Sequence, residues 1–254
     1  MTAAIVYRYI DAPFDVNGIT IMSFNSRNIK IALVSALTLL LAACGSTPQP
    51  TVPLQTNNVG ADKRVVFAYV GPEDAKGTTH IYGASCLLCY GVAAGLTSSL
   101  DTHLESTVDA TELEAIRDVV ISEYRQHNSN ISLVTLNTEV SKLKKFKGEH
   151  GFAPKDFRPL AESLNADVLV LLEMQEHGAF RSFSGYVPNG DPQGYVRGLL
   201  STIDLKTNAY IQYLVIDEKV QPEGEWDEPT TFPGVTHAYY QAVENVKQKL
   251  ADAI

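Results

Sequence analysis

The chain has 254 residues, of which 45% are hydrophobic and 19% are charged, and its formal net charge at pH 7 is −9. This length is enough for one domain with a sizeable hydrophobic core, or at most for two small domains. An acid-rich surface repels phosphate groups, which excludes nucleic-acid binding and broad electrostatic attachment to anionic lipid headgroups.

The first element along the chain is an apolar run of 13 residues, Ile31–Ala43, with Arg27 and Lys30 before it and Cys44 after it. A cationic flank, a short apolar helix and a small-residue end are typical of a secretory signal peptide. At about 1.5 Å per residue the run covers roughly 20 Å, which is too short for the ~30 Å hydrocarbon core of a bilayer. We therefore expect residues 1–43 to be a signal peptide rather than a membrane span.

Acidic residues do not belong in the cationic start of a signal peptide, so we expect translation to begin at Met22 rather than at Met1. The segment Leu41–Cys44 resembles a bacterial lipobox, which implies cleavage before Cys44 and acylation of that residue. By the same resemblance, Gly45 as the next residue directs the lipoprotein to the outer membrane, facing the periplasm. Palmitate is the acyl chain expected on the mature amino terminus.

Residues 44–63 contain three prolines and few apolar side chains, which indicates a flexible tether behind the acylated cysteine. The folded domain is predicted over residues 64–254. We expect a single α+β domain with one mixed β-sheet of about five strands and helices packed on it. The predicted strands are Val65–Val70, Ile131–Leu136, Asp167–Met174, Tyr195–Asp204 and Ala209–Ile216, by their β-branched and apolar content.

Four helices are predicted between and after these strands. The first carries an apolar ladder with a period of four, and Gly91 and Gly95 are expected to let it approach the sheet closely. A capping-box pattern opens the second helix at Asp109. The ladder of the first helix consists of Leu88, Val92, Leu96, Leu100 and Leu104. The third and fourth helices are predicted over Phe157–Asn165 and approximately Val235–Ala253. The polar stretches Glu73–Thr79, Gly178–Gly194 and Gln221–Gly234 are predicted as loops.

The junction from Leu160 to Val170 (LAESLNADVLV) places a helix, a small residue, an acidic residue and an apolar strand in succession, and Ile203–Asn208 (IDLKTN) forms a hairpin turn. With the lipobox and the tether, this order resembles a group of periplasmic domains. The group comprises the amino-terminal domain of the Tol translocation protein TolB, penicillin-binding-protein activators, and curli-secretion and exopolysaccharide-export lipoproteins. The resemblance implies an assembly or activation factor rather than an enzyme, and a homo-oligomer.

Cys86 and Cys89 remain once Cys44 is assigned to acylation. In an oxidising compartment the pair can form a disulfide, and at a helix start the dipole would lower the pKa of a thiol, as in disulfide oxidoreductases. The intervening Leu87 and Leu88 replace the Gly-Pro that is typical of thioredoxins. A local disulfide, two small buried thiols, a redox pair and metal ligands all remain open, and we favour a structural role.

Two cysteines without a second close pair are a weak zinc signal, so neither a metal nor a cofactor is predicted. Aromatic side chains crowd the two longer predicted loops, where rings can dock a protein or stack on sugar rings. The partner-binding candidates are Phe180, Phe183, Tyr186, Tyr195, Trp226 and Phe232. The alternative is that these rings fold back over a helix edge.

No catalytic constellation is found. The sequence therefore predicts a non-catalytic lipoprotein of the outer membrane that binds an envelope protein or polysaccharide, as an accessory factor in envelope assembly, export or cell-wall synthesis. The alternative is a periplasmic thiol-redox or metal-handling protein that uses Cys86 and Cys89.

Overall fold

A computed structural model describes residues 47–228 and 231–254, and the residues from Gln49 to Ile254 form one unit. The predicted signal peptide, the alternative start at Met22 and the acylation site Cys44 lie outside the described residues. No helix among the residues that the structure describes is long and apolar enough to cross a membrane.

Seven strands and four helices make up this α+β unit, so the prediction of about five strands was too low. The strands are β1 (Val65–Val70), β2 (Thr78–Tyr82), β3 (Ser132–Val134), β4 (Val168–Ser184), β5 (Val187–Pro188), β6 (Gln193–Asp204) and β7 (Tyr210–Val220). The helices are α2 (Leu87–Thr107), α3 (Thr111–His127), α4 (Leu160–Leu164) and α5 (Pro233–Ala253). Single 3₁₀ turns lie at Thr56–Asn58 and Val140–Lys142.

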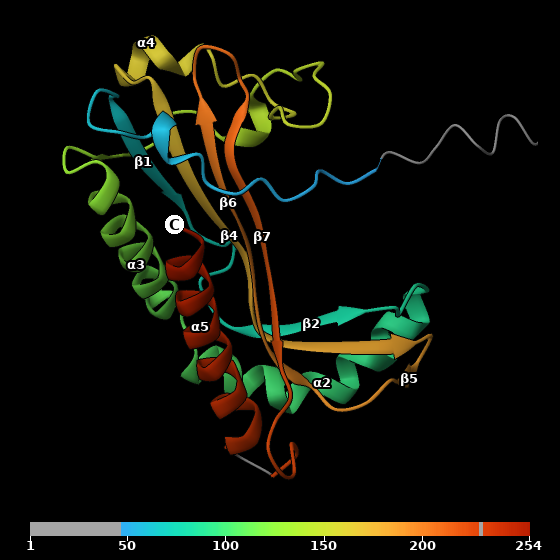
Figure 1. Ribbon diagram of the computed structural model, residues 1–254. Coiled ribbons are helices and arrows are strands. Elements are labelled where there is room, and N and C mark those ends of the chain that lie inside the picture. Colours follow the sequence, from blue (N-terminus) through green and yellow to red (C-terminus); the bar gives the residue numbers. More distant parts are fainter. Residues whose placement is uncertain (1–46, 229–230) are drawn as a thin grey trace, which may run out of the picture. The chain divides into compact units, whose positions relative to one another are not determined.

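The strand β4 organises the sheet (Figure 1). The strand order is β3-β1-β4-β6-β7, and β2 and β5 pair with the second half of β4. The first half of β4 runs parallel to β1, its second half runs parallel to β2, and β6 follows the opposite edge of β4 as an antiparallel partner. One 17-residue strand thus joins two parallel pairs end to end.

The sequence prediction ended this strand at Met174 and began a loop at Gly178, which is wrong. The register against β6 shifts between Met174 and Glu176, so a bulge separates the apolar first half from the more polar second half. At Gly178 the backbone has φ 118°, and an added Cβ would lie 2.4 Å from the Thr78 carbonyl oxygen. The alternation of apolar and polar residues is interrupted at the bulge. For this reason the sequence did not predict the second half of β4 or its partner β2.

The hydrophobic core lies on both faces of the sheet. On one face, α3 and α5 cover β1, β4, β6 and β7 with side chains such as Leu113, Ile116 and Val243, all at most 1% exposed. Both helices were predicted from the sequence. The other face is covered by the segment from Leu136 to Leu164, which includes α4, over residues such as Leu169 and Leu171.

The described unit begins at Gln49, before residue 64, where the sequence placed the start of the domain. Val52 forms an antiparallel bridge with Tyr213 of β7, and Val59 is completely buried. The side-chain amide of Asn128 donates to the carbonyls of Gly60 and Lys63, at 2.9 Å each. Most of the predicted tether is therefore packed against the unit, because its few apolar side chains find places at the edge of the core.

Candidate functional site

Cys86 and Cys89 are joined by a disulfide at the start of α2, with a Cα–Cα distance of 4.9 Å. Cys86 is the N-cap residue, and its sulfur accepts the backbone N–H of Cys89 at 2.9 Å. Cys86 is exposed and Cys89 is half-buried. Among the described residues, no group of three or more His, Cys, Asp and Glu side chains could hold a metal ion.

The amino-terminal half of α2 is apolar and faces solvent, which corrects the predicted ladder. Leu100 and Leu104 are buried as expected, whereas Leu88 is 82% exposed and Leu96 is 49% exposed. The buried residues in this half are Ala93 and Thr97, so the ladder assigned the wrong face to the first three turns. Period-four spacing alone could not locate the sheet beneath this helix.

The glycines of α2 do not serve a close approach either. An added Cβ at Gly91 or Gly95 would meet nothing within 4 Å, so both residues lie on open parts of the helix. The turn between β4 and β5 lies beside the disulfide, since a Cβ at Gly185 would be 4.0 Å from the sulfur of Cys89. We call the exposed apolar residues of these two segments the α2 surface: Leu87, Leu88, Tyr90, Val92, Leu96, Tyr186 and Val187.

The six aromatic candidates differ widely in exposure. Phe183, Tyr195 and Phe232 are at most 5% exposed, so these three rings belong to the core and are not available to a partner. Trp226 is half-buried and stacks on Phe232, with the guanidinium of Arg181 over its ring at 4.6 Å from the centroid. Trp226 and Phe232 thus pack against each other, with Arg181 on the Trp226 ring.

Phe180 is half-buried on the sheet face away from α5. Its ring lies 5.4 Å from that of Tyr195, and the ammonium group of Lys219 lies 4.7 Å from its centroid. Tyr186 is 64% exposed and belongs to the α2 surface. Of the six candidates, Tyr186 therefore presents the most accessible ring.

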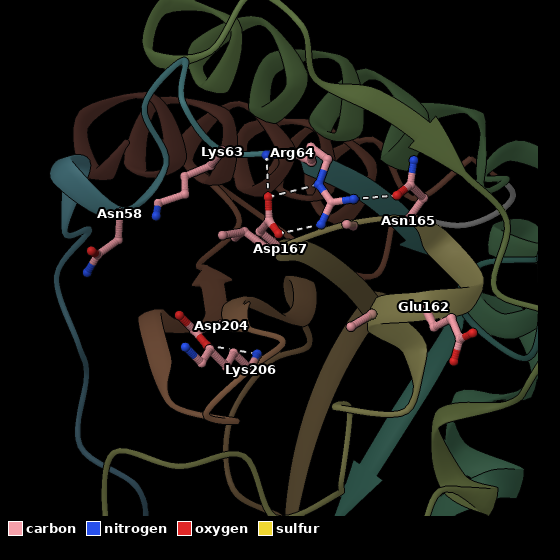
Figure 2. Close-up of a pocket in the computed structure, with 11 residues that line it drawn as sticks. Asn58, Lys63, Arg64, Glu162, Asn165, Asp167, Asp204 and Lys206 are labelled. Carbon is pink, nitrogen blue, oxygen red and sulfur yellow. Dashed lines mark hydrogen bonds and ion pairs between the residues drawn. The ribbon is translucent and has the colours of Figure 1, made fainter.

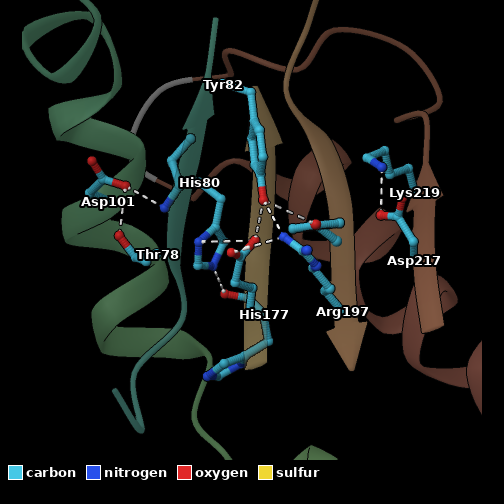
Figure 3. A network of polar contacts seen from close by, with 11 residues as sticks. Thr78, His80, Tyr82, Asp101, His177, Arg197, Asp217 and Lys219 are labelled. Carbon is cyan, nitrogen blue, oxygen red and sulfur yellow. Dashed lines mark hydrogen bonds and ion pairs between the residues drawn. The ribbon is translucent and has the colours of Figure 1, made fainter. Parts of the chain in front are cut away.

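A polar network crosses β2, β4 and β6 on the same sheet face (Figure 3). The carboxylate of Glu176 accepts the Tyr82 hydroxyl at 2.6 Å and lies 3.4 Å from the Arg197 guanidinium. Arg197 also donates to the Tyr82 hydroxyl at 3.0 Å, and His80 lies 3.7 Å from Glu176. The side chains satisfy one another, so this network fastens β2 to β4 and β6 beyond the bulge.

The sequence missed the network because its members are far apart along the chain. Glu176 and His177 are neighbours that point to opposite faces, as expected for a strand. His177 is only 2% exposed, and its Nδ1 is hydrogen-bonded to the Tyr239 hydroxyl at 3.3 Å. The alternation of side chains along β4 could have indicated which residues share a face, but the bulge interrupts it.

A hollow of about 510 Å³ lies at the amino-terminal end of β4 (Figure 2). Arg64 and Asp167 form an ion pair in its lining, with Nη2–Oδ1 and Nε–Oδ2 distances of 2.6 and 3.0 Å. Hydrogen bonds from the side chain and backbone of Arg64 lower the pKa of Asp167 from 3.8 to about 2. The cations and carboxylates lining this hollow are balanced in number, so it favours neither an anionic nor a cationic ligand.

No family model matches the chain, and a search of curated proteins finds no match. Among solved structures, the hypothetical protein CT253 from Chlamydia trachomatis aligns at 10% identity and TM-score 0.35, over 75% of this chain and 98% of its own. The PelC dodecamer from Paraburkholderia phytofirmans aligns at 10% identity and TM-score 0.31, over 82% and 91% of the two chains.

Lipoprotein GNA1162 from Neisseria meningitidis aligns at 9% identity and TM-score 0.27, over 74% of this chain and 99% of its own. The chain is thus similar in outline to several bacterial proteins, one of them a lipoprotein. At these identities and TM-scores the likenesses carry no argument about activity or partners.

Proposed function

We propose that this chain is a lipid-anchored, non-catalytic binding protein of the bacterial envelope. The anchor is Cys44, whose acyl chains hold the protein in the outer membrane. The unit from Gln49 onward faces the periplasm. There it acts as an accessory factor in envelope assembly, export or cell-wall synthesis. The oligomer that the family resemblance implies stays a prediction.

The α2 surface is the observation that carries the binding role. It places five apolar side chains of one helix and two of the neighbouring turn in solvent, on a chain with a net charge of −9. An exposed apolar patch on an otherwise polar surface marks a contact with another molecule or a membrane. The polar network, in contrast, is occupied by its own internal bonds.

The anchor is tested by mass spectrometry of the protein recovered from cell fractions. The expected amino-terminal peptide begins at Cys44 and carries a thioether-linked diacylglycerol and an amide-linked acyl chain. A Cys44→Ser variant should lose this modification and its membrane fraction. Recovery of the unmodified chain from the cytosol would refute the proposal.

The binding role is tested with a photo-crosslinking residue at Leu88, compared with one at Leu133. Both side chains are more than half exposed, but Leu133 lies on β3 and not on the α2 surface. We expect adducts with an envelope component, protein or lipid, from position 88 and not from position 133. Equal adduct yields at the two positions would contradict a binding role for the α2 surface.

A second function, thiol–disulfide exchange, is favoured by one observation: Cys86 is exposed at the N-cap of α2, where the dipole stabilises a thiolate. Equilibration of the protein with glutathione buffers distinguishes the two functions. A redox protein should exchange rapidly in the folded state at a potential close to that of the periplasmic oxidants. A structural disulfide should stay oxidised until strong reductant is added.

A further inference from the structure

The α2 surface contains no charged residue. The stretch of 20 residues from Ile81 to Leu100 has no Asp, Glu, Lys or Arg, and neither has the stretch Ser182–Gly190 that holds the neighbouring turn. With 19% of the chain charged, about four charges are expected in the first stretch alone. Together these two stretches contain all seven residues of the α2 surface.

The apolar side chains surround the solvent-facing side of α2 rather than forming one stripe. At 100° per residue, the exposed residues 87, 88, 90, 92 and 96 are spread over most of the helix circumference, and the buried Ala93 and Thr97 occupy the remainder. A protein-binding helix normally combines one apolar face with a polar rim that makes hydrogen bonds. A helix that is apolar all round matches a hydrocarbon environment better.

The polarity of α2 also changes along its axis. Exposed apolar residues end at Leu96, and the exposed side chains of Ser98 and Ser99 follow. The apolar part therefore covers about three turns, or roughly 15 Å of helix, which is too short to span a bilayer and long enough to enter one leaflet. Tyr90 and Tyr186 add rings of the kind that favours the membrane interface.

The predicted lipid anchor is joined to the unit by only a short stretch of chain. Cys44 precedes Gln49 by five residues, so at most about 18 Å of extended chain separates them. An acylated Cys44 would therefore keep the unit close to one bilayer.

We propose that the tip of α2, together with the β4–β5 turn, inserts into the interfacial region of the lipid bilayer as a second, protein-made membrane contact. This inference rests on the proposed lipid-anchored function and names the bilayer as the component that the α2 surface binds. Insertion is driven by apolar area rather than by charge, since the surface is neutral and the chain is acidic. The two contacts together would fix the orientation of the unit on the membrane.

The test uses the fragment Gln49–Ile254, which contains the whole described hydrophobic core and lacks Cys44. The fragment is floated with phosphatidylcholine vesicles at low salt and at about 0.5 M NaCl. The higher salt concentration screens the interactions between surface charges. We expect it to float at both salt concentrations, and to bind anionic phosphatidylglycerol vesicles no better. Leu88→Asp should weaken vesicle binding at least about tenfold.

Leu133→Asp is the matched control, because it places the same charge on another exposed leucine and should leave flotation unchanged. Leu87→Ser serves as a second variant at an 89% exposed site, should Leu88→Asp fail to fold. Failure of the fragment to float, or equal flotation of the position 88 and position 133 variants, would overturn the inference. So would a dimer in sedimentation that Leu88→Asp converts to monomer, because a second copy would then cover the surface.

The two proposals can fail separately. An acylated Cys44 combined with a fragment that ignores vesicles leaves the lipid-anchored function and removes the insertion. A fragment that binds vesicles while the full chain is recovered unmodified from the cytosol keeps the surface chemistry and removes the anchor.

Discussion

Tyr124 of α3 connects the helix layer to the sheet through one buried hydroxyl group. The side chain is completely buried, and its hydroxyl donates to the side-chain Oε1 of Gln212 on β7 at 2.6 Å. The Tyr124 hydroxyl is also bonded to the hydroxyl of Thr202 on β6. Replacing Tyr124 with Phe keeps the ring and removes one oxygen, which leaves two buried polar groups without their partner.

The expected cost follows from this arrangement. Leaving a buried polar group without its hydrogen-bond partner costs about 1–3 kcal/mol of stability. Here two such groups, on Gln212 and Thr202, lose the same partner. We expect Tyr124→Phe to lower the free energy of unfolding by about 2–3 kcal/mol. For a unit of about 200 residues with an m-value of about 2 kcal/mol per M of urea, the unfolding midpoint should fall by roughly 1 M.

Tyr69 supplies the control within the same chain. Its hydroxyl oxygen is buried but finds no hydrogen-bond partner among the residues that the structure describes. Tyr69→Phe should therefore change the free energy of unfolding by no more than about 0.5 kcal/mol, or raise it slightly. Urea titration of the fragment Gln49–Ile254 measures both variants, and an equal loss in the two would refute the reasoning.

Three further predictions concern packing, pH and redox state. Gly194→Ala should cost at least about 2 kcal/mol, because its Cβ would lie 2.1 Å from the backbone of α5, whereas Gly91→Ala in α2 should stabilise by about 0.5–1 kcal/mol. Burial lowers the pKa of His177 below 6.5, so the unfolded chain binds the proton first and urea midpoints should fall as pH drops below about 6.5. Reducing the Cys86–Cys89 disulfide should cost at most about 2 kcal/mol, because it closes a loop of only four residues.

Each of these has an outcome that contradicts it. Equal midpoints for the two glycine variants would mean that β6 and α5 are further apart than the structure has them. A His177→Gln variant that keeps the full pH dependence between about pH 5 and 7 would assign the titration to other groups. Global unfolding on reduction would show that the disulfide supports more than the first turn of α2.

The sequence by itself determined the α+β class, all four helices of the described unit and five of the seven strands. These elements have periodic apolar residues, which report burial on a helix face or a buried strand without reference to partners. Helices α3 and α5 are the clearest cases, because their stripes face one continuous core. The signal-peptide pattern before Cys44 is also a property of local sequence alone.

Only the tertiary structure decided which faces and which distant residues come together. The bulge in β4 interrupts alternation, so β2 and the network of Glu176, Tyr82 and Arg197 could not be found by pattern. Leu88 and Leu96 follow the period of a buried ladder but face solvent, because the sheet lies under Ala93 and Thr97 instead. Periodicity states that a helix has an apolar side, and only packing determines whether another element of the chain covers it.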